Sequence, residues 1–274
     1  MGSVSLFGST GFIGTAYANY SENQVDGVDR NNPDPLFTEI VYALGTTDNY
    51  NVFDNPLLDV ESNILKLISD LELMRDKFGT FTINYLSSWF VYGDSGKPPF
   101  RENQHCEPKG FYSISKLSAE MFLRSYCETF GIRYRILRLA NVFGKGDSRA
   151  SKKKNALQYL IEEIKAGRDV NVYEGGDFLR DYIDVRDVVR AIDLIIKSQP
   201  DETIINVGTG NPTKFGDLLD RARIGFASES KLIPIDTPDF HRKVQVKDAY
   251  LDISTLAEIG FIPKYSVLDE IINL

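Results

Sequence analysis

LFGSTGFIGTAYANY, residues 6–20, joins a short apolar run to a helix-like segment through three closely spaced glycines. The apolar residues Val4–Phe7 predict a strand that ends at this turn. Gly8, Gly11 and Gly14 permit a tight turn and let backbone N–H groups approach a pyrophosphate. The pattern G-x-x-G-x-x-G alone fits a dinucleotide-binding turn or a glycine-rich turn that binds nothing. The order of strand, turn and helix favours the nucleotide.

Strand-like apolar runs alternate with helix-like segments through the first half of the chain. Further strands are predicted at Val25–Val28, Glu39–Ala43, Thr80–Leu86 and Tyr134–Leu139, and helices at Gly11–Tyr20, Asp59–Phe78 and Ser113–Phe130. This alternation predicts a mostly parallel sheet covered by helices, a Rossmann-like doubly wound α/β fold. We expect residues 1–150 to form mainly the dinucleotide-binding domain. Residues 151–274 should form mainly a smaller C-terminal substrate lobe, with about 181–210 returning to the first domain.

Composition limits the partners and the cellular location. The 274 residues are 42% hydrophobic with a mean hydropathy of -0.22, and the net charge of -8 argues against a nucleic-acid partner. No apolar run approaches the roughly 18 residues of a membrane span, and no basic region precedes an apolar core near the N-terminus. We therefore expect a cytoplasmic protein with no membrane partner. Cys106 and Cys127 should be free thiols, and no spacing of His and Cys predicts a metal site.

A second motif is GFYSISKLSAE, residues 110–120. Tyr112 and Lys116 are four residues apart, so they share one face of a helix. A lysine cation there would lower the pKa of the phenol and make the tyrosine a usable proton donor or acceptor. An ordinary amphipathic helix produces the same spacing. Upstream, NYLSSWFVYGD ends an apolar strand with Ser87 and Ser88, at the end of the strand where α/β sheets bind ligands.

Together these segments resemble the extended short-chain dehydrogenase/reductase family, in its nucleotide-sugar epimerase and dehydratase branch. GSTGFIG resembles the cofactor loop of the family, SSWFVYG its S-S-x-x-V-Y-G segment, and YSISK its Y-x-x-x-K motif. LRLANVFG is similar to R-x-x-N-V-Y-G and contains Arg138. GGDFLRDYIDVRDVVRAI is similar to G-x-x-x-R-D-Y-V-x-V-x-D, and NVGTG follows it. The similarity runs nearly end to end.

The resemblance implies roles for individual residues. Tyr112 would be the acid/base, Lys116 would hold the nicotinamide ribose and tune Tyr112, and Ser88 would hydrogen-bond the reacting sugar oxygen. Cofactor-binding residues would be Gly8, Gly11, Phe12, Ile13, Gly14, Asp29, Arg30 and Leu44, together with Tyr112 and Lys116. Substrate-binding residues would be Ser88, Asn141, Asn155, Arg180 and Arg242, with the two arginines on the diphosphate of a nucleotide-diphosphate sugar.

The segment Asp29–Thr38 is short for this family. A helical crossover needs a dozen or more residues, whereas ten extended residues reach about 33 Å and suffice for a plain loop. Pro33 and Pro35 lie within it. We therefore expect a sheet that lacks one edge strand on the adenine side. Asp29 would take the adenosine ribose and favour NAD, while Arg30 keeps NADP open as the alternative.

Reaction type depends on Trp89 and Phe90. In the 4,6-dehydratases of the family an Asp-Glu pair holds these two positions, and neither Trp nor Phe can transfer a proton, which disfavours a dehydratase. An epimerase is expected, with a nucleotide-sugar 4-ketoreductase as the alternative and a non-catalytic NAD(P)-binding protein as a third hypothesis. The family also implies a homodimer built through a four-helix bundle that includes the Asp59–Phe78 helix.

Overall fold

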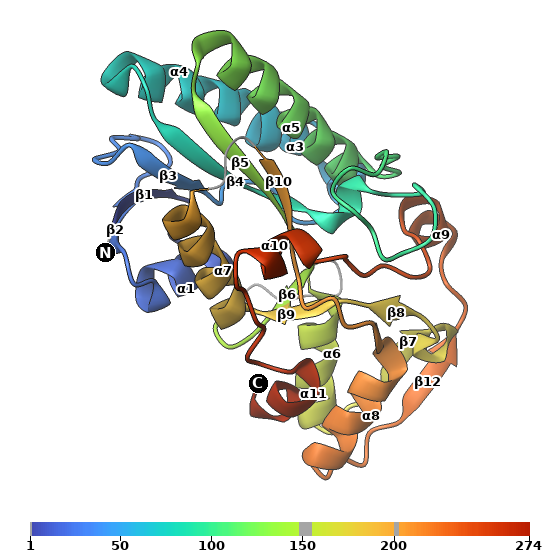
Figure 1. Ribbon diagram of the computed structural model, residues 1–274. Coiled ribbons are helices and arrows are strands. Elements are labelled where there is room, and N and C mark those ends of the chain that lie inside the picture. The colour runs from blue at the N-terminus through green and yellow to red at the C-terminus, as the bar shows by residue number, and fades with distance from the viewer. Residues whose placement is uncertain (1, 148–154, 200–202) are drawn as a thin grey trace.

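A computed structural model describes residues 2–147, 155–199 and 203–274 (Figure 1). A six-stranded sheet with the order β10-β5-β4-β3-β1-β2 lies at its centre. The strands are β1 (Ser3–Phe7), β2 (Gln24–Val28), β3 (Glu39–Tyr42), β4 (Thr82–Ser88), β5 (Arg133–Leu139) and β10 (Thr203–Val207). Every neighbouring pair in this sheet is parallel. The predicted doubly wound parallel sheet is therefore confirmed.

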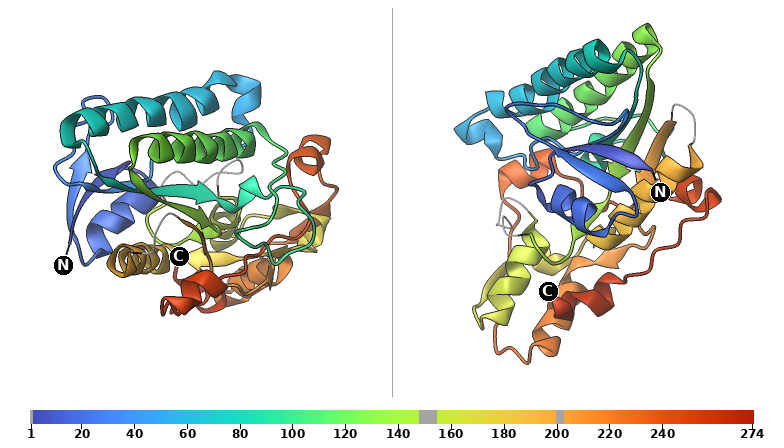
Figure 2. Two further views of the ribbon diagram at one scale, coloured as in Figure 1. Left: turned by 45° about the horizontal axis from the view of Figure 1, so that its top comes forward. Right: turned by 90° about the vertical axis from the view of Figure 1, so that its left-hand side faces the viewer.

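Helices cover both faces of the sheet because its strands are apolar on both sides. Side chains of β1 alternate, so that Val4 and Leu6 enter one core and Phe7 enters the other. Helices α1 (Phe12–Tyr20) and α7 (Val185–Ser198) pack on the first face. Helices α4 (Lys66–Phe78) and α5 (Phe111–Phe130) pack on the second, and Figure 2 shows the sheet between these two layers.

The helix expected over Asp59–Phe78 is present and contains a π-helical turn. It consists of α3 (Leu57–Val60), a π-helical turn η1 (Glu61–Leu65) and α4. The wider turn contains the buried side chain of Asn63, which hydrogen-bonds the backbone N–H of Thr46 and the hydroxyl of Ser115. Periodicity of apolar residues does not reveal such a turn, because a polar contact with other segments stabilises it.

The short segment after β2 acts as predicted. β2 forms one edge of the sheet, and the loop at residues 29–38 leads to β3 on the opposite side of β1. The backbone N–H of Phe37 bonds the Ser5 hydroxyl at 2.8 Å, and that of Leu36 bonds the Asp26 carboxylate at 3.3 Å. The loop therefore replaces the outer strand unit and is attached to both β1 and β2.

A smaller lobe follows β5 and has its own apolar core. Its elements are β6 (Asn141–Phe143), α6 (Ala156–Lys165), β7 (Val170–Tyr173), β8 (Leu179–Arg180), β9 (Tyr182–Asp184), β11 (Thr213–Lys214), α8 (Phe215–Gly225), β12 (Leu232–Ile235), α9 (Asp239–Val244) and α11 (Val267–Glu270). Between these elements the chain returns to the central layer through α7 and β10, and α10 (Ser254–Glu258) packs on β10. No helix in the described ranges is both long and apolar enough to cross a bilayer.

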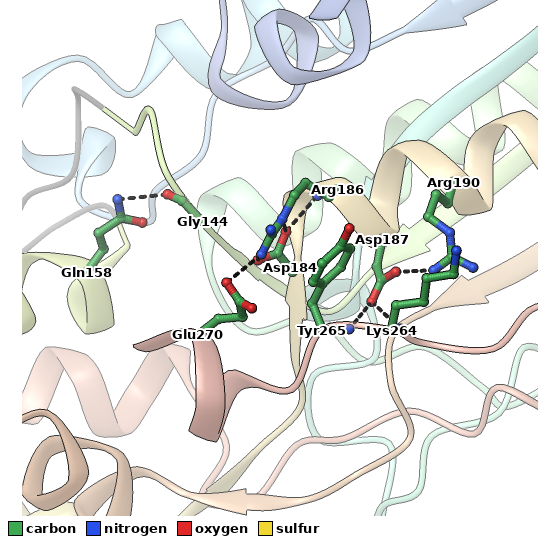
Figure 3. A network of polar contacts seen from close by, with 9 residues as sticks. All are labelled: Gly144, Gln158, Asp184, Arg186, Asp187, Arg190, Lys264, Tyr265 and Glu270. Atoms are coloured by element: carbon green, nitrogen blue, oxygen red, sulfur yellow. Dashed lines mark hydrogen bonds and ion pairs between the residues drawn. The ribbon is translucent and has the colours of Figure 1, made fainter. Parts of the chain in front are cut away.

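A charged network attaches the C-terminal segment to helix α7 (Figure 3). Asp184 caps the first turn of α7, and Arg186 bonds both Asp184 and Glu270 at 2.8 and 2.7 Å. The buried carboxylate of Asp187 accepts backbone hydrogen bonds from Lys264 and Tyr265. These contacts hold the end of the lobe against the sheet layer, which fixes the relative position of the two parts that flank the site.

Candidate active site

The glycine turn after β1 has no room for side chains. Gly8 has φ +86°, and a Cβ there would lie 2.8 Å from the carbonyl carbon of Ala43. A Cβ at Gly14 would lie 2.0 Å from the Gly8 oxygen. These positions therefore require glycine, and the helix that follows packs close to the end of the sheet.

Helix α1 begins at this turn with free donors. Its N-cap is Gly11, whose backbone N–H bonds the Gly8 oxygen at 3.0 Å and which offers no side-chain cap. The N–H groups of Phe12 and Ile13 stand at the start of the helix, outside its own hydrogen-bond ladder. Donors at a helix N-terminus over bare glycine suit a pyrophosphate, so this turn fits a dinucleotide cofactor. Leu44, partly buried, follows β3 next to the turn.

The two residues that bear on cofactor choice lie on the surface beyond β2. One Asp29 carboxylate oxygen accepts backbone hydrogen bonds from Asn31 and Asn32, both at 2.8 Å, and these bonds lower the pKa of Asp29. Arg30 donates to the Ser62 hydroxyl at 3.2 Å. Asp29 thus closes its own turn, and Arg30 reaches toward η1.

Ser88 and Tyr112 meet at the carboxyl end of β4. Ser88 is the last residue of that strand, and its hydroxyl lies close enough to the phenol of Tyr112, in the first turn of α5, to lower the pKa of that phenol. Burial raises the pKa of Tyr112 to about 12, although the Ser88 contact lowers it. The carboxylates of Asp59 and Asp48 raise this pKa further. The phenol is therefore protonated at neutral pH.

The side chain of Lys116 contacts strand β4. Its ammonium donates to the Tyr85 hydroxyl and to the Leu86 carbonyl, both at 2.7 Å. Burial lowers the pKa of Lys116 to about 7. The expectation that this cation lowers the pKa of Tyr112 toward neutrality is wrong for this arrangement, because the amine bonds β4 and burial dominates at the phenol.

A buried polar network beside Tyr112 was not foreseen. Asp59 accepts hydrogen bonds from the Thr46 hydroxyl and, at 3.0 Å, from the Asn51 amide. Asn63 bonds Thr46 and Ser115, both at 2.8 Å, and so connects the segment after β3 to helix α5. The available signal was the pair of polar residues Asp59 and Asn63, which are four apart and so share one face of the predicted helix.

A cavity of about 350 Å³ adjoins this site on the side of the lobe. Residues 47–50, the 3-10 turn η2 (Trp89–Val91) and several lobe elements line it. Asn141, Asn155 and Arg180 are among its lining residues, as the sequence predicts for a substrate site. Ser88, Tyr112 and Lys116 do not line it. Phe90 bridges the two regions, because it lines the cavity and its ring meets that of Tyr112 edge-on at 5.9 Å.

Arg180 brings a buried positive charge to the cavity. Its guanidinium donates to the backbone carbonyls of Leu179 and Val246, both at 2.9 Å, and to that of Lys247. Burial lowers its pKa to about 10, so it is still charged at neutral pH. In the part of the chain that the structure describes, no carboxylate forms an ion pair with it. Such a cation suits an anionic ligand.

The two asparagines at the cavity make local contacts. Asn141 accepts from the Trp89 indole at 3.2 Å and donates to the Asp181 carbonyl at 3.0 Å. Asn155 has φ 50°, caps helix α6 and donates to the Asp147 carboxylate at 2.9 Å.

Arg242 does not reach the cavity, contrary to expectation. Its side chain is 57% exposed and pairs with Asp239 at 2.5 Å. Helix α9 turns His241 and Val244, three residues apart, toward the cavity instead. His241 packs 4.9 Å from the Tyr173 ring, and burial lowers its pKa to about 4. The sequence could not show which face of so short a helix points inward.

Comparisons with known proteins agree with this geometry. Residues 34–208 match the family model described as "NAD dependent epimerase/dehydratase family". The chain is 32% identical over 235 residues to a putative UDP-glucose 4-epimerase of Methanocaldococcus jannaschii, covering 85% of this chain and 74% of the relative. It is 27% identical over 185 residues to the GDP-6-deoxy-D-mannose reductase of Pseudomonas aeruginosa, covering 66% of this chain and 60% of that protein.

The fold also matches a solved structure. That structure is the UDP-glucose 4-epimerase of Thermotoga maritima with UDP-glucose, at a TM-score of 0.85 and 23% identity, covering 98% of this chain and 96% of that one. At this identity the likeness concerns the fold. The family model spans more than half of the chain, and it includes the Ser88, Tyr112 and Lys116 positions. The chain therefore belongs to the NAD-dependent epimerase/dehydratase family.

Proposed function

We propose that the chain is an NAD-dependent nucleotide-sugar epimerase that acts by reversible hydride transfer at a sugar carbon. The observation that carries this proposal is the buried cation of Arg180 in a cavity that adjoins the neighbouring side chains of Ser88 and Tyr112. A diphosphate at Arg180 would place the attached sugar toward Tyr112. The relatives named above act on nucleotide sugars by their descriptions, which supports the same substrate class.

The cofactor would lie along the carboxyl ends of the strands. NAD, when bound, supplies the hydride acceptor and donor. The N–H groups of Phe12 and Ile13 over Gly8, Gly11 and Gly14 would hold its pyrophosphate. Lys116 would hold the nicotinamide ribose, Leu44 would contact the cofactor, and Asp29 would hold the adenosine ribose. Arg30 supports NADP as the alternative.

The residues of the chain would manage the proton. Tyr112 holds a proton at its phenolic oxygen at neutral pH and can donate it to a sugar oxygen. To accept a proton from a sugar hydroxyl, Tyr112 must first be a phenolate, and a hydrogen bond from the Ser88 hydroxyl would stabilise that phenolate. Lys116 lies one helical turn away on the same face of α5. Ser88 would also orient the reacting sugar oxygen.

Substrate binding would depend on local contacts, because the chain carries a net charge of -8 and repels a dianion at long range. Arg180 is the proposed diphosphate contact. Asn141 and Asn155 would contact the nucleotide sugar from neighbouring elements of the lobe. We assign no contact to Arg242, since it is exposed and paired with Asp239.

A nucleotide-sugar 4-ketoreductase is the second candidate, and one observation favours it. The sheet ends at β2, so the adenine side of the cofactor would have fewer contacts than a further strand unit would give. A reductase must exchange its cofactor after every turnover, and weak contacts make this exchange faster. Trp89 and Phe90 still disfavour a dehydratase, and the Ser88–Tyr112 pair argues against a purely non-catalytic protein.

We further propose a homodimer built through a four-helix bundle. Ile114, Met121 and Phe122 on α5 are 46%, 64% and 49% exposed, and Leu65 on the neighbouring η1 is 56% exposed. Figure 1 shows α4 and α5 along the same outer side of the sheet. Apolar side chains gathered on paired helices suit burial against a second copy. We also propose a cytoplasmic location, in line with the composition of the chain.

The test is incubation with UDP-, GDP-, dTDP- and CDP-sugars, with and without added NADH or NADPH, followed by NMR of the sugar products. Isomerised sugar without net cofactor consumption identifies an epimerase. Net consumption identifies a reductase. Tyr112→Phe serves as the blank for both reactions, and wild-type protein that matches this blank on every sugar contradicts the enzymatic proposal.

A further inference from the structure

The side chains of Trp89 and Phe90 stand between the proton-bearing phenol and the buried cation. Their rings stack with centroids 4.0 Å apart and planes 28° apart, and both residues line the cavity. The Phe90 ring meets Tyr112 at 5.9 Å, and the Arg180 guanidinium lies 5.4 Å from the Trp89 ring. The aromatic pair therefore spans the interval between the two groups that would hold the ends of a sugar diphosphate.

The pair is held in a defined position. Trp89 is 4% exposed, and its indole N–H bonds Asn141 at 3.2 Å. The backbone N–H of Phe90 bonds the Ser88 hydroxyl at 3.3 Å. Phe90 is only partly buried and contributes accessible apolar surface to the cavity. Phe90 is thus the exposed ring of the pair, and Trp89 is the fixed ring behind it.

The Tyr112 end of the cavity is acidic. Asp48 lines the cavity and is 6% exposed, and Asp59 is fully buried nearby. Both carboxylates are close enough to Tyr112 to raise the pKa of its phenol. Positive charge lies at the opposite end, on Arg180. A second anionic group on the substrate would consequently meet an apolar ring and negative charge at the Tyr112 end.

We propose that Phe90, backed by Trp89, is the platform on which the sugar ring of the substrate lies, and that this end of the cavity selects neutral sugars over hexuronic acids. The proposal rests on the proposed function, since Arg180 must hold the diphosphate for the ring to reach Phe90. The C–H face of a pyranose packs on an aromatic ring without losing hydration of its hydroxyls. Among the described residues, no Lys or Arg lines the Tyr112 end of the cavity, so a sugar carboxylate there would lose hydration without gaining a charged partner.

The first experiment measures affinities by isothermal titration of the wild-type protein. UDP-, GDP-, dTDP- and CDP-glucose identify the preferred nucleotide, and the glucose and glucuronate forms of that nucleotide are then compared. We expect the glucuronate form to bind about tenfold more weakly, because its charge is desolvated without a partner. Asp48→Asn, which removes one negative charge, should reduce the difference in affinity between the glucose and glucuronate forms.

Matched variants locate the sugar. Phe90→Leu keeps apolar volume but removes the ring. It should weaken binding of the nucleotide sugar about fivefold, the size of one aromatic contact, and leave the affinity for the nucleoside diphosphate unchanged. Phe178→Leu is the control, because the Phe178 ring lies 4.7 Å from the Arg180 guanidinium. Phe178→Leu should lower the affinity for the nucleotide sugar and for the nucleoside diphosphate by the same factor.

Fluorescence gives a readout independent of affinity. Trp89 is the single tryptophan of the chain, so selective indole emission reports on this position alone. The nucleotide sugar should change this emission more than the nucleoside diphosphate does. Three results would each overturn the platform while the proposed function stands. They are equal emission changes with the nucleotide sugar and the nucleoside diphosphate, equal affinity for the glucose and glucuronate forms, and an equal loss of affinity for the nucleotide sugar and the nucleoside diphosphate in Phe90→Leu. Failure of every nucleotide sugar to bind would overturn both.

Discussion

The ammonium of Lys116 lies 2.7 Å from the hydroxyl of Tyr85, a residue buried inside the sheet layer. The Tyr85 ring stacks on Tyr42 at 6.0 Å, and Tyr42 in turn donates a hydrogen bond to Asp70. The amine is therefore attached to the core of the domain. Its protonation is governed by burial, which lowers the pKa of Lys116 to about 7.

This burial predicts a dependence of stability on pH. The pKa of Lys116 falls from about 10.5 in the unfolded chain to about 7 in the folded one, so the unfolded state binds more protons between these values. The free energy of unfolding of the wild type should rise with pH across that window, relative to Lys116→Met. Urea denaturation at several pH values measures the difference, and parallel pH curves for the two proteins would contradict the prediction.

Removal of the Tyr112 hydroxyl should abolish turnover selectively. Tyr112→Phe should lower kcat about a thousandfold, the usual size of a lost general acid/base, and leave cofactor affinity nearly unchanged because the ring is retained. Tyr92→Phe is the control, since it deletes a buried hydroxyl that bonds Asn206 at 2.6 Å. Steady-state kinetics on the identified substrate measure this effect. A Tyr112→Phe enzyme as active as the wild type would refute the acid/base role of Tyr112.

Substitution of the two arginines expected on the diphosphate should affect KM to different extents. Arg180→Ala should raise KM about ten- to a hundredfold, because a charge-assisted bond to a buried cation is lost. Arg242→Ala should change KM little, because its side chain is exposed and paired with Asp239. kcat should change less than KM, since the diphosphate is held alike before and during reaction. An unchanged KM in Arg180→Ala would exclude the diphosphate contact.

Cofactor retention should be weak. With β2 at the edge of the sheet, the adenosine would contact Asp29, Arg30 and the loop at 29–38 but no further strand unit. We expect the purified protein to lose NAD on dialysis and to rebind NAD or NADP with measurable exchange. Isothermal titration after dialysis checks this, and a stoichiometric cofactor that survives dialysis would count against it.

A buried ion pair beneath the site should matter greatly for stability. Glu120 and Arg138 are 2% and 4% exposed and lie 2.7 Å apart, with Ser87 also bonded to Glu120. Glu120→Ala should lower the free energy of unfolding by about 3–5 kcal/mol, since it leaves a buried charge without its partner. Arg223→Ala, which breaks the exposed pair with Asp220, should cost under about 1 kcal/mol. Equal losses in urea denaturation would contradict this ranking.

The fold was predictable where its information is local. The glycine turn, the alternation of strands and helices, and the ten residues between β2 and β3 each constrain a neighbouring element, and the structure agrees with them. The π-helical turn at Glu61–Leu65 was not predictable, because Asn63 is stabilised by Thr46 and Ser115 from elsewhere in the chain.

The candidate site was likewise predictable only where its information is local in sequence. The motifs around Ser88 and Tyr112 are short in sequence, and the two side chains do meet. The direction of Lys116 depends on Tyr85 in another element, and the cavity collects residues from many segments. Arg242 shows the limit most clearly, because the rotation of a short helix about its axis decides whether Arg242 or His241 faces the cavity.

The end of the sheet at β2 also affects how the folded protein resists aggregation. β2 presents backbone N–H and C=O groups along its free side, and such a margin is a template for strand addition by another molecule. Within Gln24–Val28, the charge of Asp26 and the flexibility of Gly27 oppose that growth, while the Asp26 carboxylate also accepts the N–H of Leu36. Resistance to strand addition at this edge of the sheet therefore depends on one short strand and on the Asp26 carboxylate within it.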